Sequence, residues 1–290
     1  RDIFNMFVFL EILSIGTYGI IAIDDNRRQY SAGLKYIIAG GISSMLFLLG
    51  IVYLYRITGT LNIDGMIEAV EKARDQIGVG SAAVAASVNV AASPSMVAMT
   101  LTGSVGFAAI FLLFMGVVIE LKPFPANGWA LDVYEASHPS IAALISAVNA
   151  TVVVYVLTKI VPLFPDVLIR TLMWLGIITF IGSNLLGLKQ GNTRRMLGYS
   201  SIAQIGIVIF VVGFSELTGL SRNFLLFTAG GLLLNHLAAK TGLFWITGIS
   251  RTETGSVRVR GTASLVFALA LIGFPPFPAF WAKWQLINAL

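Results

Sequence analysis

The stretch LLFMGVVIELKPFPANGWALDVYEASHPSIAALIS (Leu112–Ser146) decides how the rest of the chain is interpreted. Its first part is apolar and ends in two opposite charges, Glu120 and Lys122, which Pro123 and Pro125 follow directly. Proline has no N–H to donate and its ring clashes with the preceding turn, so we expect the helix to break here. Charges beside a broken helix at membrane depth are costly, and they usually mark an ion pathway or a substrate site. The alternative is a helix that ends at the lipid–water interface, with Lys122 extended toward water and salt-bridged to Glu120.

The composition indicates that the solvent of this chain is a lipid bilayer. Hydrophobic residues make up 57% of the chain and charged residues 11%, whereas soluble domains are about 25% charged. The net charge of +5 comes without a continuous basic patch, which argues against nucleic acid as a partner. The absence of cysteine excludes disulfides, thiolate-held iron–sulfur clusters and thiol catalysis. No signal peptide is visible, and we expect the chain to be the interior of a longer protein.

Eight apolar segments of about 20 residues predict an all-α, polytopic membrane protein. The last of them is interrupted by a second group of prolines, Pro275, Pro276 and Pro278. The expected spans are Ile3–Ile23, Leu34–Tyr55, Met96–Leu121, Pro139–Val161, Val167–Leu188, Met196–Phe214, Asn223–Ile249 and Thr262–Leu290.

An insert at about residues 58–95 separates the second and third expected spans. Apolar residues follow a helical period over Leu61–Ile77, with acids on the other faces, which predicts an amphipathic helix at the membrane interface. The small residues of Gly78–Ser95 indicate a flexible link. Basic residues in alternate loops are divided nine to six, and the richer side, which includes Arg194 and Arg195, is expected to be cytoplasmic.

Three further sites place ionisable groups inside expected spans. Glu11 lies in the middle of the first span without another ionisable group within a helical turn, so it needs a partner on another helix, a water cavity or a proton. His236 and Lys240 share one helix face, which fits a proton relay. Lys283 follows the second proline break and is either part of a pathway or extended to the interface beside two tryptophans. Lys159, near a helix end, is an additional candidate.

Enzymatic and metal-binding patterns are not found in the sequence. The two histidines, His138 and His236, lie in different segments without the spacing of metal ligands, and no nucleotide-binding fingerprint is present. We therefore expect no catalytic site, no metal and no cofactor in this chain.

Five motifs follow one another along the chain: TGTLNI (Thr58–Ile63), PFPANGWALDVYEASHPSIAALISA (Pro123–Ala147), GNTRRMLGYSSIAQIGIVI (Gly191–Ile209), NHLAAKTGLF (Asn235–Phe244) and GFPPFPAFWAKW (Gly273–Trp284). In this order they resemble one known family, the antiporter-like membrane subunits. This family comprises the proton-pumping membrane subunits of complex I, the large Mrp cation/proton antiporter subunits and their counterparts in membrane-bound hydrogenases. The resemblance covers nearly the whole chain and implies about eight of the family's roughly fourteen helices, from the fifth to the broken twelfth, with inverted repeats.

The resemblance implies a role for each candidate residue. Glu11 matches the glutamate of the fifth helix, His236 and Lys240 match the histidine and lysine of the eleventh, and Lys283 matches the charged residue of the broken twelfth at the exit half-channel. Glu120 stands where the seventh-helix lysine is expected, with Lys122 two residues later. The place of the eighth-helix lysine falls near residues 150–151, which carry no charge.

The resemblance implies an ion-translocating subunit of a complex I-related or hydrogenase-type redox complex in a membrane, expected to be the prokaryotic cytoplasmic membrane. Protons or sodium would move along the relay, while redox chemistry would belong to partner subunits, further antiporter-like subunits among them. Residues 1–161 would end the first repeat and residues 162–290 would belong to the second. Two alternatives stay open: a non-transporting structural subunit, favoured by Glu120 and the missing lysine, and an Mrp-type antiporter subunit without a redox module.

Overall fold

Helices make up almost all of the computed structural model, which describes residues 2–23, 26–79, 103–249 and 254–290. Within these residues the only extended pairing is one isolated antiparallel bridge between Asp2 and Asn62. The expected all-α architecture is confirmed. The elements are α1 (Ile3–Ile21), α2 (Arg27–Thr58), α3 (Ile63–Val79), α5 (Ser104–Glu120), α6 (Gly128–Ala136), α7 (Pro139–Leu144), the π-helix η2 (Ile145–Asn149), α8 (Ala150–Ile160), the 3₁₀ turn η3 (Val161–Leu163), α9 (Asp166–Gly187), α10 (Thr193–Thr218), α11 (Arg222–Gly248), α12 (Thr254–Ile272) and α13 (Pro278–Ala289).

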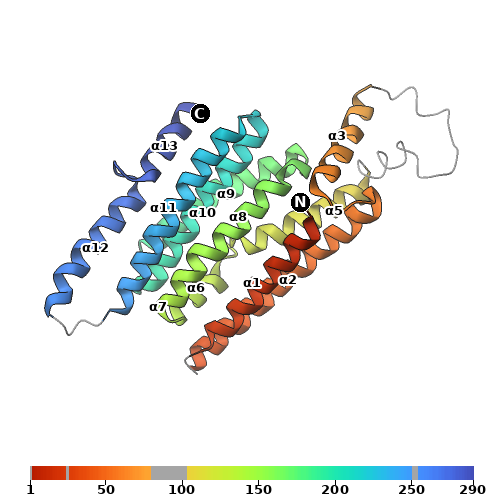
Figure 1. Ribbon diagram of the computed structural model, residues 1–290. Helices are drawn as coiled ribbons and strands as arrows, with labels where there is room; N and C mark the ends of the chain where they lie inside the picture. The colour runs from red at the N-terminus through yellow and green to blue at the C-terminus, as the bar shows by residue number, and fades with distance from the viewer. Residues whose placement is uncertain (1, 24–25, 80–102, 250–253) are drawn as a thin grey trace.

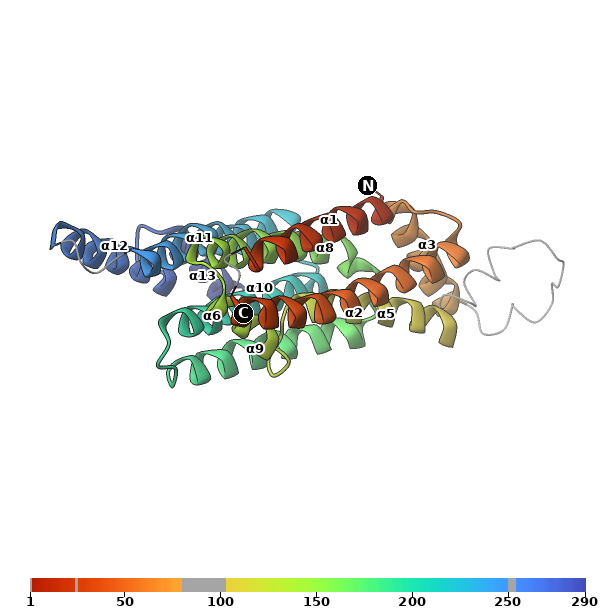
Figure 2. The same ribbon diagram turned by 90° about the horizontal axis from the view of Figure 1, so that it is seen from below.

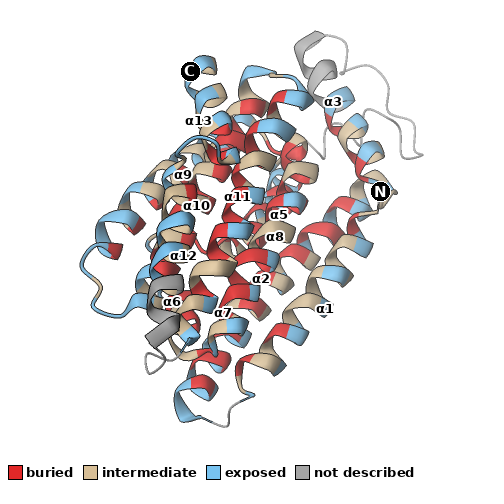
Figure 3. Ribbon diagram, turned by 60° about the vertical axis from the view of Figure 1, so that its left-hand side comes forward, coloured by how far each residue is buried: buried red, intermediate tan, exposed pale blue. Residues whose placement is uncertain are grey.

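The long helices lie side by side in one bundle, with α1 and α2 at one edge and α12 and α13 at the other (Figure 1). Seen from below, α1, α8 and α11 lie along one side of the bundle, and α2, α5 and α9 along the other (Figure 2). The pairs α9–α10, α2–α5 and α10–α11 share the most extensive contacts. Helix α10 is therefore central, and most of its residues are buried (Figure 3).

In the part of the chain that the structure describes, five stretches are long and apolar enough to cross a membrane by length and composition: α1, α2, Pro139–Leu163, α9 and α10. Helix α5 and residues Arg260–Ile272 of α12 are apolar but shorter, and α11 has 27 residues that include His236 and Lys240. All eight expected spans thus coincide with helices. The beginning of the span expected at 96–121 and most of the link expected at 78–95 lie outside the described residues.

The structure differs from the expected helix limits in two places. Helix α2 begins at Arg27, before the expected Leu34, because the side chain of Asn26 caps its first turn by accepting from the backbone N–H of Arg28. The expected single span from Pro139 is divided by η2, where five residues adopt the wider π-helical turn. Such π-helical turns are frequently found at functional sites.

The amphipathic helix of the insert is α3, as expected. Its apolar side chains Ile63, Met66 and Val70 are buried against the bundle. Glu68 and Lys72 form an exposed ion pair of 2.6 Å on another face. Helix α3 therefore packs against the other helices through its apolar face, while the face with the ion pair is exposed.

Glycines allow the backbones of neighbouring helices to approach closely. A Cβ added at Gly50 of α2 would lie 2.7 Å from the backbone nitrogen of Leu113, and one at Gly116 of α5 would lie 2.7 Å from that of Phe47. Small residues at crossing points let membrane helices pack backbone to backbone. The α2–α5 contact positions Glu120 at the end of α5 next to the polar side chains of α2.

Both expected breaks are present. Helix α5 ends at Glu120, and Lys122 adopts the left-handed conformation (φ 58°) before α6 begins at Gly128. Helix α12 ends at Ile272, and the left-handed Gly273 (φ 84°) precedes α13. Each break puts a lysine close to the end of a helix.

Candidate ion pathway

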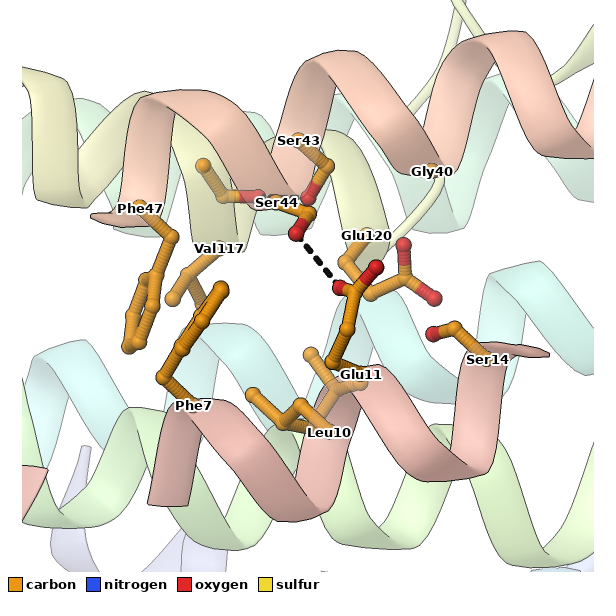
Figure 4. Close-up of a pocket in the computed structure, with 12 residues that line it drawn as sticks. Phe7, Leu10, Glu11, Ser14, Gly40, Ser43, Ser44, Phe47, Val117 and Glu120 are labelled. Carbon is orange, nitrogen blue, oxygen red and sulfur yellow. Dashed lines mark hydrogen bonds between the residues drawn. The ribbon is translucent and has the colours of Figure 1, made fainter. Parts of the chain in front are cut away.

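Two carboxyl groups from different helices line one small cavity. Glu11 of α1 and Glu120 of α5 border a space of about 30 Å³, together with the polar side chains Ser14 and Ser44. The side chains of Glu11 and Ser44 point toward each other across this space, with Glu120 beside them (Figure 4), and the Ser44 hydroxyl donates to the Glu11 carboxylate at 2.5 Å. A cavity of this size can hold a water molecule, and the two carboxyl groups and two serines supply the polar partners that a water molecule needs. The structure therefore brings together the two acids that the sequence placed on separate spans.

Lys122 is buried, with 4% of its surface exposed. Its ammonium nitrogen lies 5.7 Å from the ring centroids of both Tyr36 and Trp129, a distance at which a cation interacts favourably with the ring faces. The two rings are stacked on each other at 5.1 Å. No ion pair joins Lys122 to Glu120 or to any other acid in the described parts of the chain. The alternative of a lysine extended to water is thus wrong for this residue.

A second, separate cavity lies between the end of α5 and helix α10. It measures about 10 Å³ and is bordered by Glu120, Lys122, Tyr134, Ser146 and Ser201, among others. Ala150 also lines it, at the position where the resemblance leads to the expectation of a lysine. The hydroxyl groups of Ser146 (η2) and Ser201 (α10) are 2.8 Å apart and hydrogen-bonded.

His236 and Lys240 lie on one face of α11, and both are buried. The His236 Nε2–H donates to the backbone carbonyl of Ser146 at 3.1 Å, which leaves Nδ1 as the acceptor nitrogen. That Nδ1 atom is buried and has no partner within the described residues. The Lys240 ammonium donates to the backbone carbonyl of Leu197 at 3.1 Å and forms no ion pair in the part of the chain that the structure describes.

Lys283 is half-buried at the second break. Its ammonium donates to the carbonyl oxygens of Ile272 at 2.9 Å and Leu271 at 3.4 Å, at the C-terminal end of α12. The neighbouring Trp281 and Trp284 are exposed. The lysine is thus bound to a helix end, where the helix dipole favours a cation.

Lys159 is not brought together with the other candidates. It lies in the last turn of α8, with its ammonium nitrogen 5.3 Å from the ring centroid of Tyr155. Tyr155 itself is exposed on the outside of the bundle. The six remaining candidates are Glu11, Glu120, Lys122, His236, Lys240 and Lys283.

One charged cluster was missed by the sequence reasoning. Asp132 of α6 accepts from Lys35 at 2.5 Å and from Arg195 at 2.8 Å, and Arg195 also donates to Glu135 at 2.9 Å. Partial burial acts to raise the pKa of Asp132, but the hydrogen bonds and charges of Lys35 and Arg195 outweigh it and hold that pKa below its ordinary value. The cluster joins α2, α6 and α10 around a pocket of about 390 Å³.

The fold and the site together define an integral, multi-pass membrane protein whose broken helices carry buried ionisable groups. The model of the family described as NADH:quinone oxidoreductase/Mrp antiporter, transmembrane region, matches residues 1–290. The chain belongs to this family.

Relatives of known sequence and structure agree with this membership. NADH-quinone oxidoreductase subunit N of Desulforudis audaxviator is 30% identical over 308 residues, which cover 99% of this chain and 54% of that protein. The same subunit of Rubrobacter xylanophilus is 27% identical over 302 residues, with 100% and 56% covered. The chain thus spans about half the length of these curated relatives.

Solved structures show the same fold. A chain of an archaeal membrane-bound sulfane sulfur reductase superposes with a TM-score of 0.79 at 27% identity, over all of this chain and 56% of that one. A chain of the Mrp complex from a Dietzia species superposes with a TM-score of 0.74 at 22% identity, over all of this chain and 51% of that one.

Proposed function

We propose that this chain is part of an ion-translocating, antiporter-like subunit of a complex I-related or membrane-bound hydrogenase-type redox complex. The observation that carries this proposal is the continuity of buried polar groups. Glu11 and Glu120 share one cavity, Glu120 and Lys122 share the next with the serine pair, and Ser201 and Lys240 share one carbonyl acceptor. Ionisable groups inside a membrane are expensive, and they mark ion pathways by default.

The proposed pathway divides between the two halves of the chain. In the first half, residues 1–161, Glu11, Glu120 and Lys122 set the charge of the central relay. In the second half, residues 162–290, His236 and Lys240 pass a proton laterally, and Lys283 releases it at the second break. A change in charge at one group alters the proton affinity of the next, so coupling can travel between sites without a redox cofactor in this chain.

The partners follow from the family. Relatives named above are subunits of NADH-quinone oxidoreductases and of membrane complexes, so we place this chain beside other membrane subunits, further antiporter-like ones included. The donor and acceptor of electrons belong to those partners. The membrane is the prokaryotic cytoplasmic membrane, and the charged cluster around Asp132 and Arg195 faces the cytoplasm. Protons are the proposed ion, and sodium is the alternative.

A structural subunit that does not transport is the second candidate. The observation in its favour is that Ala150, which carries no charge, occupies the wall of the cavity next to Lys122. In that case the buried lysines would stay charged and would only hold helices together. An Mrp-type subunit would instead exchange sodium for protons without a redox reaction.

Ion flux in vesicles that contain the intact assembly tests these candidates. Acidification of the vesicle interior is followed while electron transfer is recorded in the same sample, for the wild type and for Lys240→Ala. A redox-driven subunit loses proton translocation at unchanged electron transfer and assembly. A structural subunit pumps as the wild type does. Proton flux that follows an imposed sodium gradient without an electron donor would identify the Mrp-type function.

A further inference from the structure

We propose that the paired hydroxyl groups of Ser146 and Ser201 form the proton bridge that connects the Glu120–Lys122 region to Lys240. The inference rests on the proposed function, and it names the residues that carry the lateral step. Both serines are buried, Ser146 at 0% and Ser201 at 2% exposure.

The hydrogen bonds determine which of the two serines is the donor in the bond between them. Ser201 donates its single hydroxyl proton to the carbonyl oxygen of Leu197 at 2.9 Å. Because a serine hydroxyl has one proton, Ser146 must be the donor in the 2.8 Å bond between the two side chains. Ser146 is also hydrogen-bonded to the Tyr134 hydroxyl, which then donates to it, so one lone pair of the Ser146 oxygen stays available to accept a proton from elsewhere.

The first end of the bridge opens on the cavity that Glu120 and Lys122 also line. Its volume of about 10 Å³ is at the lower limit of what one water molecule needs, and polar side chains in its mainly apolar lining supply the partners of a water molecule. A single water there can accept from Lys122 and donate to Ser146. The other group with a hydroxyl in this lining is Tyr134, whose ring stacks on Phe244.

The second end of the bridge meets Lys240. Both the Ser201 hydroxyl and the Lys240 ammonium donate to the Leu197 carbonyl oxygen, at 2.9 Å and 3.1 Å. Because both groups lie around the same oxygen, a rotation of the Ser201 hydroxyl together with a movement of the flexible lysine side chain carries the proton from Leu197 to a neutral Lys240 amine. His236 contacts the same region only through the backbone carbonyl of Ser146, which accepts a hydrogen bond but relays no proton.

The transfer balances in protons. The Lys122 ammonium gives one proton to the cavity water, which gives one of its own to Ser146. Ser146 passes its original hydroxyl proton to Ser201, and Ser201 passes its own to the Lys240 amine. Lys122 ends as a neutral amine and Lys240 as an ammonium, while water and both hydroxyls are regenerated and rotate back.

Alanine variants in the intact assembly test the bridge against two references. In vesicles, protons translocated per electron pair are measured for Ser146→Ala/Ser201→Ala, with wild type and Lys240→Ala marking the two ends of the scale. We expect the double variant to fall to the level of Lys240→Ala. Ser201→Thr, which keeps a hydroxyl group, should recover more than half of the difference. Ser200→Ala, on the neighbouring residue outside the cavity lining, should pump as the wild type does.

The outcomes separate the inference from the function on which it rests. A double variant that keeps more than half of the wild-type translocation overturns the bridge, even if Lys240→Ala fails to pump. A Lys240→Ala assembly that pumps normally overturns the proposed function and the bridge with it. If the double variant does not assemble, the Ser201→Ala variant replaces it, and translocation above half of the wild-type value again overturns the bridge.

Discussion

The ammonium group of Lys283 donates to the carbonyl oxygen of Ile272, the last residue of α12, across the second proline break. Gly273, which lies between the two helices in the left-handed conformation, leaves room for this contact, because a Cβ there would lie 3.2 Å from the lysine Cδ. The lysine therefore satisfies carbonyl groups that the end of a helix leaves without partners. One side chain holds the broken helix together and supplies the charge at the proposed exit.

Replacement of Lys283 should separate these two roles. Lys283→Met removes the cation and its hydrogen bonds at similar volume, and we expect a loss of about 1 kcal/mol in stability together with slower proton translocation. Lys283→Arg keeps a cation that can reach the same carbonyls and should restore stability. Thermal unfolding of the purified assembly measures the first effect, and vesicle acidification measures the second. A Lys283→Met assembly with unchanged stability and transport would contradict both roles.

The α2–α5 contact should tolerate no added methyl group. Gly50→Ala and Gly116→Ala place a Cβ against the backbone of the neighbouring helix, and we expect each to destabilise the protein by about 1–3 kcal/mol. Gly41→Ala on the same helix α2 is the matched control, because its added Cβ would have no atom of another helix within 4 Å. Its stability should be equal or slightly higher, since alanine favours a helix over glycine. Equal melting temperatures for Gly50→Ala and Gly41→Ala would show that the helices are not packed this closely.

The stability that Asp132 contributes should depend on pH. Its pKa in the folded protein lies below the ordinary value of 3.8, because Lys35 and Arg195 stabilise the carboxylate against the opposing effect of burial. The stabilisation is therefore present above about pH 4 and is lost as the pH falls through the folded-state value. Since the carboxylate is partly exposed, its size is at most about 1 kcal/mol.

Asp132→Asn tests that contribution. The variant should melt at a lower temperature than the wild type at pH 7, and the difference should shrink as the pH is lowered below 4. A difference that stays constant over this range would show that the charge of Asp132 does not matter to stability. Glu135→Gln provides a comparison, since within the described residues Glu135 forms an ion pair only with Arg195.

Glu11 should influence transport from a distance. Glu11→Gln removes a carboxyl group that lines the same cavity as Glu120. We expect proton translocation to slow down although Lys240 itself is unchanged. Glu68→Gln, which affects only the exposed pair with Lys72 on α3, is the control and should have no effect. Initial rates of acidification in matched vesicles provide the comparison. Equal rates for Glu11→Gln and wild type would remove the first half of the pathway from the mechanism.

The sequence predicted the elements whose causes are local. Proline positions predicted both broken helices, and apolar length predicted the spans. The i, i+4 spacing placed His236 and Lys240 on one face of α11, where both are buried. These features depend on a single segment, so periodicity and backbone chemistry suffice to find them.

The features that the sequence reasoning missed depend on contacts between segments. The Ser146–Ser201 bond joins residues 55 positions apart. Ser201 was part of a quoted motif, but nothing in that motif distinguishes it from Ser200, which is only half-buried. Lys122 and the two rings that it contacts, those of Tyr36 and Trp129, come from three different segments. The π-helix η2 has no local signature either, and the more distant helices that contact it most are α11 and α1.

The number of protons translocated per electron pair, measured for Lys240→Ala in vesicles with the intact assembly, tests the central claim most directly. Lys72→Ala, which removes an exposed lysine of α3 with its Glu68 partner still present, is the control in the same series. The pathway described above predicts that the ratio falls for Lys240→Ala and stays at the wild-type value for Lys72→Ala. An unchanged ratio for Lys240→Ala, in an assembly that transfers electrons normally, would show that the buried lysine carries no protons.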